Sequence, residues 1–203
     1  MISSKNISSR PIIDISFIKK VIPANEHYAS LVISRLRKKG LLKKITKNKY
    51  TTIENMPVLA TQLYTPCYLS SWSASQYYGY TEQILNTLQV VVTKRREAIS
   101  FENYRINFIV LPKRYFFGYT KLETKEGAIF IAEPEKLLID ALLRPREMGN
   151  FDEIINIVKN APLDAEKLVE YLLATKNISV IKRVGFLMEK YKSIDLSPRL
   201  KIK

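Results

Sequence analysis

Apolar residues near the start of the chain recur at the spacing of an α-helix. Within residues 25–39 they fall on one stripe, formed by Ala29, Val32, Ile33 and Leu36. This i, i+3, i+4, i+7 pattern is typical of a helix that packs one side against a core. Gly40 follows directly and is placed to end the helix in the left-handed conformation that glycine adopts readily. We therefore predict an amphipathic helix over residues 25–39.

A shorter helix is predicted just before it, over residues 14–22. Asp14 or Ser16 can act as its N-cap by accepting a hydrogen bond from a free backbone N–H group, and Pro23 stops the helix. Both ends of this segment thus carry residues that helix ends favour.

Two short apolar stretches that follow, at residues 42–45 and 50–53, predict the strands of a hairpin. The turn between them falls at residues 47–49, where an asparagine tolerates the positive φ that tight turns need. Helix, helix and basic hairpin is the order of a winged helix-turn-helix domain, which we place at residues 1–56. The expected first helix of such a domain is not visible in residues 1–13, which the pattern leaves open as strand, short helix or disordered chain.

Strand and helix patterns also organise the rest of the chain, which we assign to a second domain at residues 57–203. β-branched and aromatic residues predict strands at residues 88–93, 98–101, 103–111, 119–123 and 128–131. Helical spacing and caps predict helices at residues 133–143, 152–159, 164–174 and 180–191, with shorter ones after Pro57 and up to Gly79. Strands at about 88–131 followed by helices at about 133–191 predict an α+β, or mixed α/β, fold with a helical C-terminal tail.

The distribution of charge along the chain indicates the class of binding partner. The chain carries a formal net charge of +14 and a sequence pI of about 9.7. Residues 1–50 hold twelve Lys and Arg against Asp14 and Glu26, a net charge of +10, so the remaining 153 residues share only +4. An excess this large favours a polyanionic partner, either nucleic acid or an anionic membrane surface. Its concentration in the predicted winged helix favours duplex DNA.

The outward side of the helix at residues 25–39 is the predicted surface for reading a DNA major groove. Side chains able to reach base edges there are Asn25, His27, Tyr28, Ser30, Ser34, Arg35 and Lys38. Residues of the helix end and the wing are predicted to hold phosphates, namely Lys39, Lys43, Lys44, Lys47, Asn48 and Lys49. A candidate secondary DNA surface, weighed against solvated loop charges, consists of Lys94, Arg95, Arg96, Lys113 and Arg114.

Residues that bind metals or form disulfides are scarce. Cys67 and His27 are the only cysteine and histidine, which excludes a disulfide within the chain, and we expect no metal and no cofactor. Cys67 is predicted to be a small buried residue. No apolar run approaches the roughly 18 residues of a membrane span. The start of the chain also lacks a secretory signal, so we expect a cytoplasmic protein without membrane contact.

An enzyme is the second class of function considered. Glu123 and Lys125 form an E-x-K pattern at a predicted strand end, as in metal-dependent nucleases. That chemistry needs a further carboxylate to hold a divalent metal, and no Pro-Asp element precedes the pattern. We therefore predict no enzymatic activity, with a nuclease as the less favoured alternative.

Three stretches in the second region carry a family resemblance: YLSSWSASQYYGYTEQILNTLQVVVTKRR from residue 68, FFGY at residues 116–119 and AEPEKLLIDALLRP at residues 132–145. In this order, behind a winged helix, they resemble the AbiEi family of bacterial and archaeal antitoxins over roughly residues 20–145. The similar positions are Ser73, Ala74, Gly79, Phe117, Gly118, Glu135, Lys136 and Asp140. Tyr78 stands where family members often have a histidine, which argues against a catalytic histidine there.

The charged residues of the last stretch look at first like a catalytic set. On a helix, however, Lys136 and Asp140 are four positions apart and form a favourable pair. Glu133 and Glu135 suit a helix N-terminus, where carboxylates are stabilised by the helix dipole. We therefore predict a structural role for these side chains.

The resemblance implies a function that the composition does not. Antitoxins of this family are understood to repress their own operon by binding operator repeats in double-stranded DNA, and to oppose a nucleotidyltransferase-like toxin without a stable protein complex. We therefore expect a sequence-specific transcriptional repressor and antitoxin. The alternative is a stand-alone winged-helix regulator without a toxin. The helical tail at residues 152–191 is a candidate for self-association on DNA.

Overall fold

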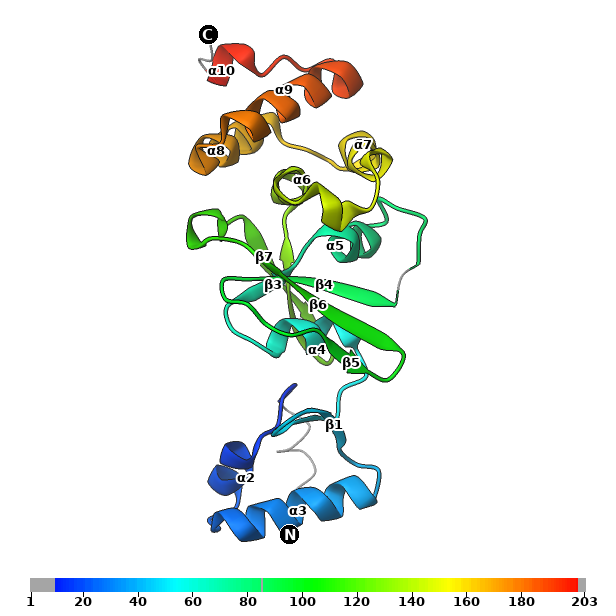
Figure 1. Cartoon of the computed structure of the whole chain (residues 1–203), viewed down its shortest axis with the longest axis vertical. Helices are drawn as coiled ribbons and strands as arrows, with labels where there is room; N and C mark the ends of the chain where they lie inside the picture. The colour runs from blue at the N-terminus through cyan, green and yellow to red at the C-terminus, as the bar shows by residue number, and fades with distance from the viewer. Residues whose placement is uncertain (1–9, 85, 201–203) are drawn as a thin grey trace.

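A mixed sheet and the helices packed on it make up most of the structure, and a smaller part with two helices and a hairpin precedes them (Figure 1). The structure is a computed structural model that describes residues 10–84 and 86–200. The predicted α+β class, with helices and a mixed sheet, is confirmed. None of the described helices has both the length and the apolar composition needed to cross a bilayer.

The N-terminal part consists of α2 (Ile15–Val21), α3 (Glu26–Lys38), β1 (Lys43–Thr46) and β2 (Lys49–Thr51). Asp14 caps α2, because its Oδ1 accepts a 2.7 Å hydrogen bond from the backbone N–H of Phe17. Gly40 follows α3 with φ +70°, and the N–H of Leu41 donates to the carbonyl of Leu36 across the helix end. The predicted helices, the Asp14 cap and the hairpin are thus confirmed.

A bridge to the hairpin precedes α2. Ile13 pairs with Tyr50 of β2, and the N–H of each donates to the carbonyl of the other at 2.8 Å. Of the segment whose structure the sequence left open, residues 1–9 lie outside the described residues. The helices and the hairpin enclose a small apolar cluster of Ile13, Ile18, Ala29, Val32, Ile33 and Leu42. This cluster is distinct from the main core, so the N-terminal part has a small core of its own.

The sheet contains β3 (Cys67–Leu69), β4 (Thr87–Val92), β5 (Ile99–Phe101), β6 (Tyr104–Val110), β7 (Tyr119–Thr124) and β8 (Gly127–Ala132). Their order across the sheet is β5-β6-β4-β3-β8-β7. β4 runs parallel to β6, whereas β3 runs antiparallel to β4 and parallel to β8. β4 and β6 therefore end at the same edge of the sheet, and β3 begins there.

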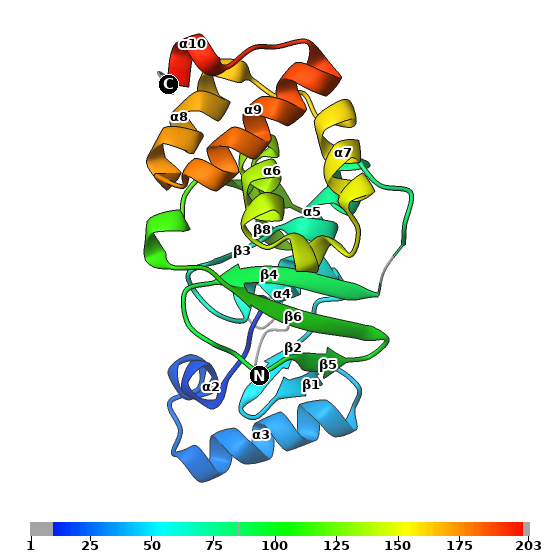
Figure 2. The same ribbon diagram turned by 45° about the horizontal axis from the view of Figure 1, so that its top comes forward.

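Helices cover both faces of the sheet: α4 (Met56–Gln62), α5 (Ser71–Tyr78), α6 (Pro134–Leu143), α7 (Phe151–Asn160), α8 (Ala165–Thr175), α9 (Ile178–Lys192) and α10 (Ser197–Leu200). α4 packs on the side of the sheet that faces the N-terminal part, and α5 and α6 lie on the opposite side (Figure 1). α7, α8 and α9 pack on α6 as an outer layer (Figure 2). The predicted helical tail is thus confirmed.

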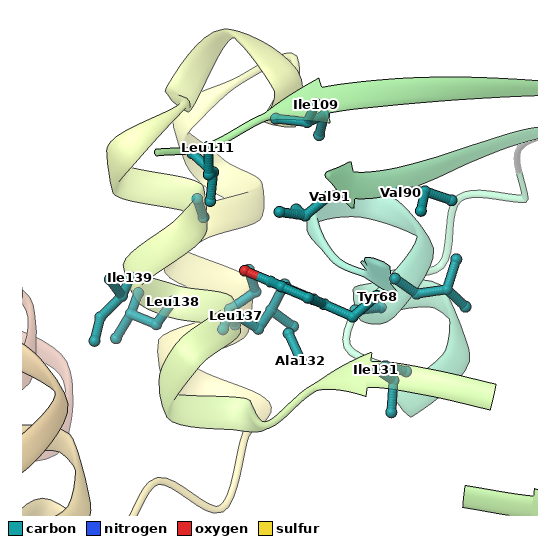
Figure 3. Packing of buried hydrophobic residues seen from close by; sticks show 14 of the residues in the cluster. Tyr68, Val90, Val91, Ile109, Leu111, Ile131, Ala132, Leu137, Leu138 and Ile139 are labelled. Atoms are coloured by element: carbon teal, nitrogen blue, oxygen red, sulfur yellow. The ribbon is translucent and has the colours of Figure 1, made fainter. Parts of the chain in front are cut away.

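The main core extends over both faces of the sheet, and Figure 3 shows its part between the sheet and α6. Val90 and Val91 of β4 are buried, as are Leu137 and Leu138 of α6. Tyr68 of β3 reaches from the sheet toward α6, with its hydroxyl group at the helix (Figure 3). Because helices cover both faces, five of the six residues of β4 are buried, including Gln89, and burial does not alternate along the strand.

Among the described strands and α-helices, two elements were not predicted. β3 lies before the predicted strand region of residues 88–131, and α10 follows the last predicted helix. All three residues of β3 are buried in the middle of the sheet, so this strand shows neither the alternation nor the length that identifies a strand in a sequence. Cys67, its first residue, is 3% exposed, as expected for a small buried side chain.

Candidate nucleic-acid interface

Helix α3 has one buried side and one exposed side. Asn25 caps the helix by accepting a 2.9 Å hydrogen bond from the backbone N–H of Tyr28. Ala29, Val32 and Ile33 face the small N-terminal cluster. Because these three residues anchor one side, the opposite side of the helix is open to solvent.

Every side chain predicted to read the major groove is exposed on α3 or at its cap. This set is Asn25, His27, Tyr28, Ser30, Ser34, Arg35 and Lys38. Tyr28 and Leu31 keep 45% and 40% of their surface exposed, so the helix also offers apolar surface beside its cations. The cap uses the side-chain oxygen of Asn25 and leaves its amide N–H groups for another partner.

The wing turn presents cations from a fixed backbone. Asn48 has φ +56°, in line with the positive φ expected of the turn asparagine, and its Oδ1 accepts a 3.2 Å hydrogen bond from the N–H of Ile15. Lys44 and Lys47 are exposed on the hairpin, and Lys39 is exposed at the end of α3. The Asn48 contact ties the turn to α2, while these three lysines point their charge at solvent.

Lys43 and Lys49 are turned toward the second part of the chain. Lys43 Nζ lies 2.7 Å from Glu102 Oε1 and 3.5 Å from Glu54 Oε1, and the hydrogen bond to Glu102 raises the pKa of Lys43. Lys49 Nζ donates to the carbonyl of Leu63, and partial burial lowers the pKa of Lys49. Both ammonium groups thus have partners within the protein, which compete with the phosphates that these lysines are predicted to bind.

Glu126 makes another connection between the two parts. Its Oε2 accepts hydrogen bonds of 3.1 Å from the backbone N–H groups of Glu54 and Asn55, just before α4. Ile45 and Ile53, on either side of the wing turn, belong to the main core. The wing is therefore packed against the sheet-bearing part.

Some cations of this part had not been assigned to the interface from the sequence. Arg10, Lys19, Lys20 and Arg37 are all exposed. The guanidinium of Arg37, on α3, lies 6.0 Å from the ring centre of Tyr50 in the wing. Their charge was visible in the sequence, but a helical wheel of α3 alone does not show that Arg37 leans toward the wing.

The candidate secondary surface divides into separate places. Lys94, Arg96 and Lys113 line one hollow with a volume of about 480 Å³. Arg114 lines a different hollow, at the turn between α8 and α9, and Arg95 lines neither of the two. The structure thus brings three of the five predicted cations together.

The E-x-K pattern lies on an exposed strand end. Glu123 pairs with Lys121 at 2.5 Å, and 69% of the Glu123 side chain is exposed. In the described part of the chain, no three His, Cys, Asp or Glu side chains converge as a metal site requires. The carboxylates that nuclease chemistry needs are therefore not gathered around Glu123 and Lys125.

A buried polar network joins β3 to α6. Lys136 Nζ donates to the Tyr68 hydroxyl at 3.0 Å and forms an ion pair with Asp140. Asp140 Oδ2 accepts hydrogen bonds from the hydroxyls of Tyr68 at 3.0 Å and Ser70 at 2.9 Å. Burial lowers the pKa of Lys136 and raises the pKa of Asp140, while their mutual attraction opposes both effects. Because Lys136 is 0% and Asp140 2% exposed, this set is closed to a substrate and links sheet to helix.

Glu133 and Glu135 connect α6 to α8. Lys167 Nζ lies 3.1 Å from Glu133 Oε1 and 3.6 Å from Glu135 Oε2. Glu135 Oε1 also accepts a 2.9 Å hydrogen bond from the N–H of Asp164, which caps α8. Both carboxylates thus lie at the start of α6, as predicted, and their contacts with α8 are an addition that the sequence did not show.

Two further family-like positions are glycines with positive φ. Gly79 ends α5 with φ +74°. Beside it, the Tyr78 hydroxyl donates to the carbonyl of Ala132 at 3.0 Å, and burial raises the pKa of Tyr78. Gly118 has φ +66°, and a Cβ there would lie 2.7 Å from the ring of Tyr171. These residues therefore shape the fold around α5, β8 and α8.

Comparison with known proteins agrees with this arrangement. The crystal structure of the RV2827C protein from Mycobacterium tuberculosis is similar, with a TM-score of 0.61 and 14% sequence identity over 96% of this chain and 78% of that chain. At this identity the similarity shows the fold alone. A comparison with curated protein sequences gives no match. The family model of the AbiEi antitoxin C-terminal domain matches residues 67–190, more than half of the chain. The resemblance inferred from the sequence is thereby confirmed, and the chain belongs to the AbiEi antitoxin family.

Proposed function

We propose that residues 1–56 form a winged helix-turn-helix domain that binds duplex DNA, followed by an antitoxin domain at residues 57–203. Two helices, a hairpin and a strand-like bridge from Ile13 to Tyr50 match the order of elements in such domains. The small apolar cluster of this part supports its description as a domain. In this arrangement α3 is the helix that enters the major groove.

The observation that carries the proposal is the exposed, cationic side of α3 and the wing. Glu26 and Asp14 are the only acidic residues among the first fifty, against twelve Lys and Arg. Arg35 can present its guanidinium in a bidentate way to guanine, which gives base specificity. Lys38 and the exposed wing lysines would bind phosphates, which contribute affinity at any sequence.

The family adds the biological role to this proposal. The combination of an antitoxin domain with a DNA-binding domain supports the proposal that the protein binds operator repeats and represses its own toxin–antitoxin operon. Its toxin would be a nucleotidyltransferase-like protein that the antitoxin opposes without a stable complex. Two copies on a repeated operator would also allow self-association through the helical tail.

A binding measurement on the DNA upstream of the protein's own gene tests the groove-reading surface. We expect the double variant Arg35→Ala with Lys38→Ala to lose at least about tenfold in affinity, because one base contact and one phosphate contact are removed. The logarithm of the affinity should fall steeply with the logarithm of the salt concentration, and less steeply in the variant.

Arg146→Ala with Arg199→Ala is the matched control for charge. Both arginines are exposed and lie outside α3, the wing and the helical tail of residues 152–191, and their loss lowers the net charge by the same amount. We expect this variant to bind the upstream DNA within about twofold of the unmodified protein, since long-range charge effects are screened at physiological salt. Unchanged affinity in the α3 variant, or an equal loss in the control variant, would remove α3 as the reading helix.

Co-expression with the neighbouring toxin gene tests the antitoxin role separately. We expect the protein to restore growth when the toxin is expressed. The Arg35→Ala, Lys38→Ala variant should restore growth equally, because the family domain at residues 67–190 is unchanged. Failure of the unmodified protein to restore growth would favour a regulator without an antitoxin role.

A further inference from the structure

A hollow lies at the edge of the sheet where β4 and β6 end and β3 begins. Its lining includes Tyr64, Thr93, Lys94, Arg96, Lys113 and Phe116, and we call it the basic hollow. Its volume of about 480 Å³ is within the range of small-ligand sites. The carboxyl ends of parallel strands are also where open sheets with helices on both faces commonly bind ligands.

Three cations line the basic hollow without a carboxylate to balance them. Lys94 and Arg96 follow β4 and Lys113 follows β6, and no Asp or Glu is part of the lining. Within residues 10–84 and 86–200, none of the three forms an ion pair. Uncompensated charge of one sign around a concave surface concentrates the potential and attracts an anion.

Positive charge is further concentrated at the ring of Tyr64. Lys49 Nζ lies 4.1 Å and the guanidinium of Arg96 lies 4.4 Å from the centre of this ring. The pKa of Lys49 is lowered mainly by burial and next by the charge of Arg96, so the two cations repel each other. An anion bound beside them would relieve this repulsion, whereas an apolar ligand would not.

Hydroxyl groups and a ring beside these charges narrow the class of anion. Thr65 and Thr93 line the basic hollow, and Phe116 adds an aromatic surface. Phosphate oxygens accept charge-assisted hydrogen bonds from Lys and Arg. Aromatic rings stack on bases. A phosphate joined to a nucleoside uses both features, whereas a small inorganic anion uses only the first.

We propose that the basic hollow is a binding site for a nucleotide phosphate, with Lys94, Arg96 and Lys113 around the phosphate group. This site is separate from the groove-reading side of α3 and does not depend on it. The phosphate comes either from a free mononucleotide or from a nucleic-acid strand that passes the wing, because both present the same group to the basic hollow.

Isothermal titration calorimetry on the full chain in about 0.15 M salt, where solvated surface charges are largely screened, tests the proposal with three probes. These are adenosine 5′-monophosphate, adenosine, and a single-stranded hexanucleotide unrelated to the operator. We expect saturable binding of the monophosphate or the hexanucleotide and none of adenosine. Arg96→Ala and Lys113→Ala should each weaken the binding by about tenfold or more, as expected when a charge-assisted hydrogen bond is lost.

Arg95→Ala is the matched control, because Arg95 is the exposed neighbour of Arg96 and does not line the basic hollow. We expect Arg95→Ala to change the affinity less than about twofold, since the charge of a solvated side chain outside the basic hollow is screened by salt. Thermal unfolding of each variant checks that these exposed substitutions leave the fold intact.

The outcomes identify the source of the phosphate and also decide whether the proposal holds. Binding of the monophosphate identifies a free-nucleotide site, and binding of the hexanucleotide alone identifies a strand site. Absence of both, or equal losses in Arg95→Ala and Arg96→Ala, overturns the proposal. The Arg35→Ala, Lys38→Ala variant keeps the basic hollow unchanged and should bind these probes normally, so failure of this site is separable from failure of operator binding.

Discussion

Lys136 and Asp140 place two charges in a part of the core that solvent does not reach. Asp140→Asn leaves a buried ammonium without its counter-charge, so we expect the free energy of unfolding to fall by about 3–5 kcal/mol. Adding Lys136→Met removes the remaining desolvated charge, and the amide oxygen of the introduced asparagine would still accept from Tyr68 and Ser70. We therefore expect the double variant to be more stable than Asp140→Asn alone. Urea unfolding followed by circular dichroism measures both values.

The exposed pair of Lys121 and Glu123 is the control for this prediction. Its side chains are 55% and 69% exposed, so water already screens their attraction. Lys121→Ala should cost less than about 1 kcal/mol. A similar loss at the exposed and the buried pair would show that burial is not the reason for the large effect at Asp140.

Gly118 combines a left-handed backbone with a close neighbour. Its φ is +66°, and an added Cβ would meet the ring of Tyr171 at 2.7 Å. We expect Gly118→Ala to lower the free energy of unfolding by about 2–4 kcal/mol, from backbone strain and overpacking together. Thermal and urea unfolding provide the measurement.

Two other glycines separate the effect of backbone strain from the effect of overpacking. Gly79 has φ +74° but open space around the added Cβ, so Gly79→Ala should cost only the strain, about 1–2 kcal/mol. Gly185 lies within α9 with open space and no positive φ, so Gly185→Ala should raise stability by about 0.5–1 kcal/mol. If Gly118→Ala costs no more than Gly79→Ala, the contact with Tyr171 does not restrict this position.

The N-terminus of α3 depends on Asn25 for its cap, and the same residue is predicted to contact DNA. Asn25→Ala should lower the free energy of unfolding by about 1 kcal/mol, because the N–H of Tyr28 loses its acceptor. Asn25→Ser keeps a side-chain oxygen at the cap and should restore most of this loss. Chemical unfolding tests the pair, and equal stability of the two variants would show that the cap contributes nothing.

Helices with caps and periodic apolar residues could be predicted because their signals are local. The predicted helix over residues 25–39 is observed as Glu26–Lys38, with Gly40 after it, and α8 starts at the expected cap Asp164. β3 could not be predicted, because a three-residue buried strand is defined by its neighbours β4 and β8 and not by its own sequence.

The candidate interface could be predicted in part for the same reason. Exposure of Arg35 and Lys38 follows from the helical period of α3 alone. The inward contact of Lys49 with Leu63 follows from the docking of the wing on the sheet, which the sequence does not show. Lys94 and Lys113 meet because β4 and β6 are parallel neighbours, and strand order is likewise a property of the folded chain.

The described chain contains two apolar clusters of unequal size. The N-terminal part and the sheet-bearing part should therefore unfold locally at different free energies. We expect the backbone N–H of Ile33 in α3 to exchange with deuterium at least about tenfold faster than that of Ile139 in α6. Glu126→Ala removes the acceptor of Glu54 and Asn55 and should speed exchange in α3 further while leaving α6 unchanged. Equal protection of the two helices would show that the chain opens only as one unit.

Alkaline pH should destabilise the whole fold through groups that are buried in their protonated form. Burial raises the pKa of Cys67 to about 12 from an ordinary value of 9.0, so the native state keeps a proton that the unfolded chain releases. The stability contributed by this thiol is therefore complete below pH 9 and is lost as the pH rises from 9 toward 12, at up to about 1.4 kcal/mol per pH unit.

Cys67→Ser isolates this contribution, because a serine hydroxyl does not ionise in this range while other titrating groups, such as Tyr68, are present in both proteins. We expect the stability advantage of the unmodified protein over Cys67→Ser, measured by urea unfolding, to be constant from pH 7 to 8.5. Between pH 9.5 and 10.5 it should shrink by about 1 kcal/mol, because only the unmodified chain gains free energy by ionising when it unfolds. A difference that stays constant through pH 10.5 would mean that the native thiol ionises as readily as the unfolded one, and that the closed packing between β3 and α4 does not exclude water from Cys67.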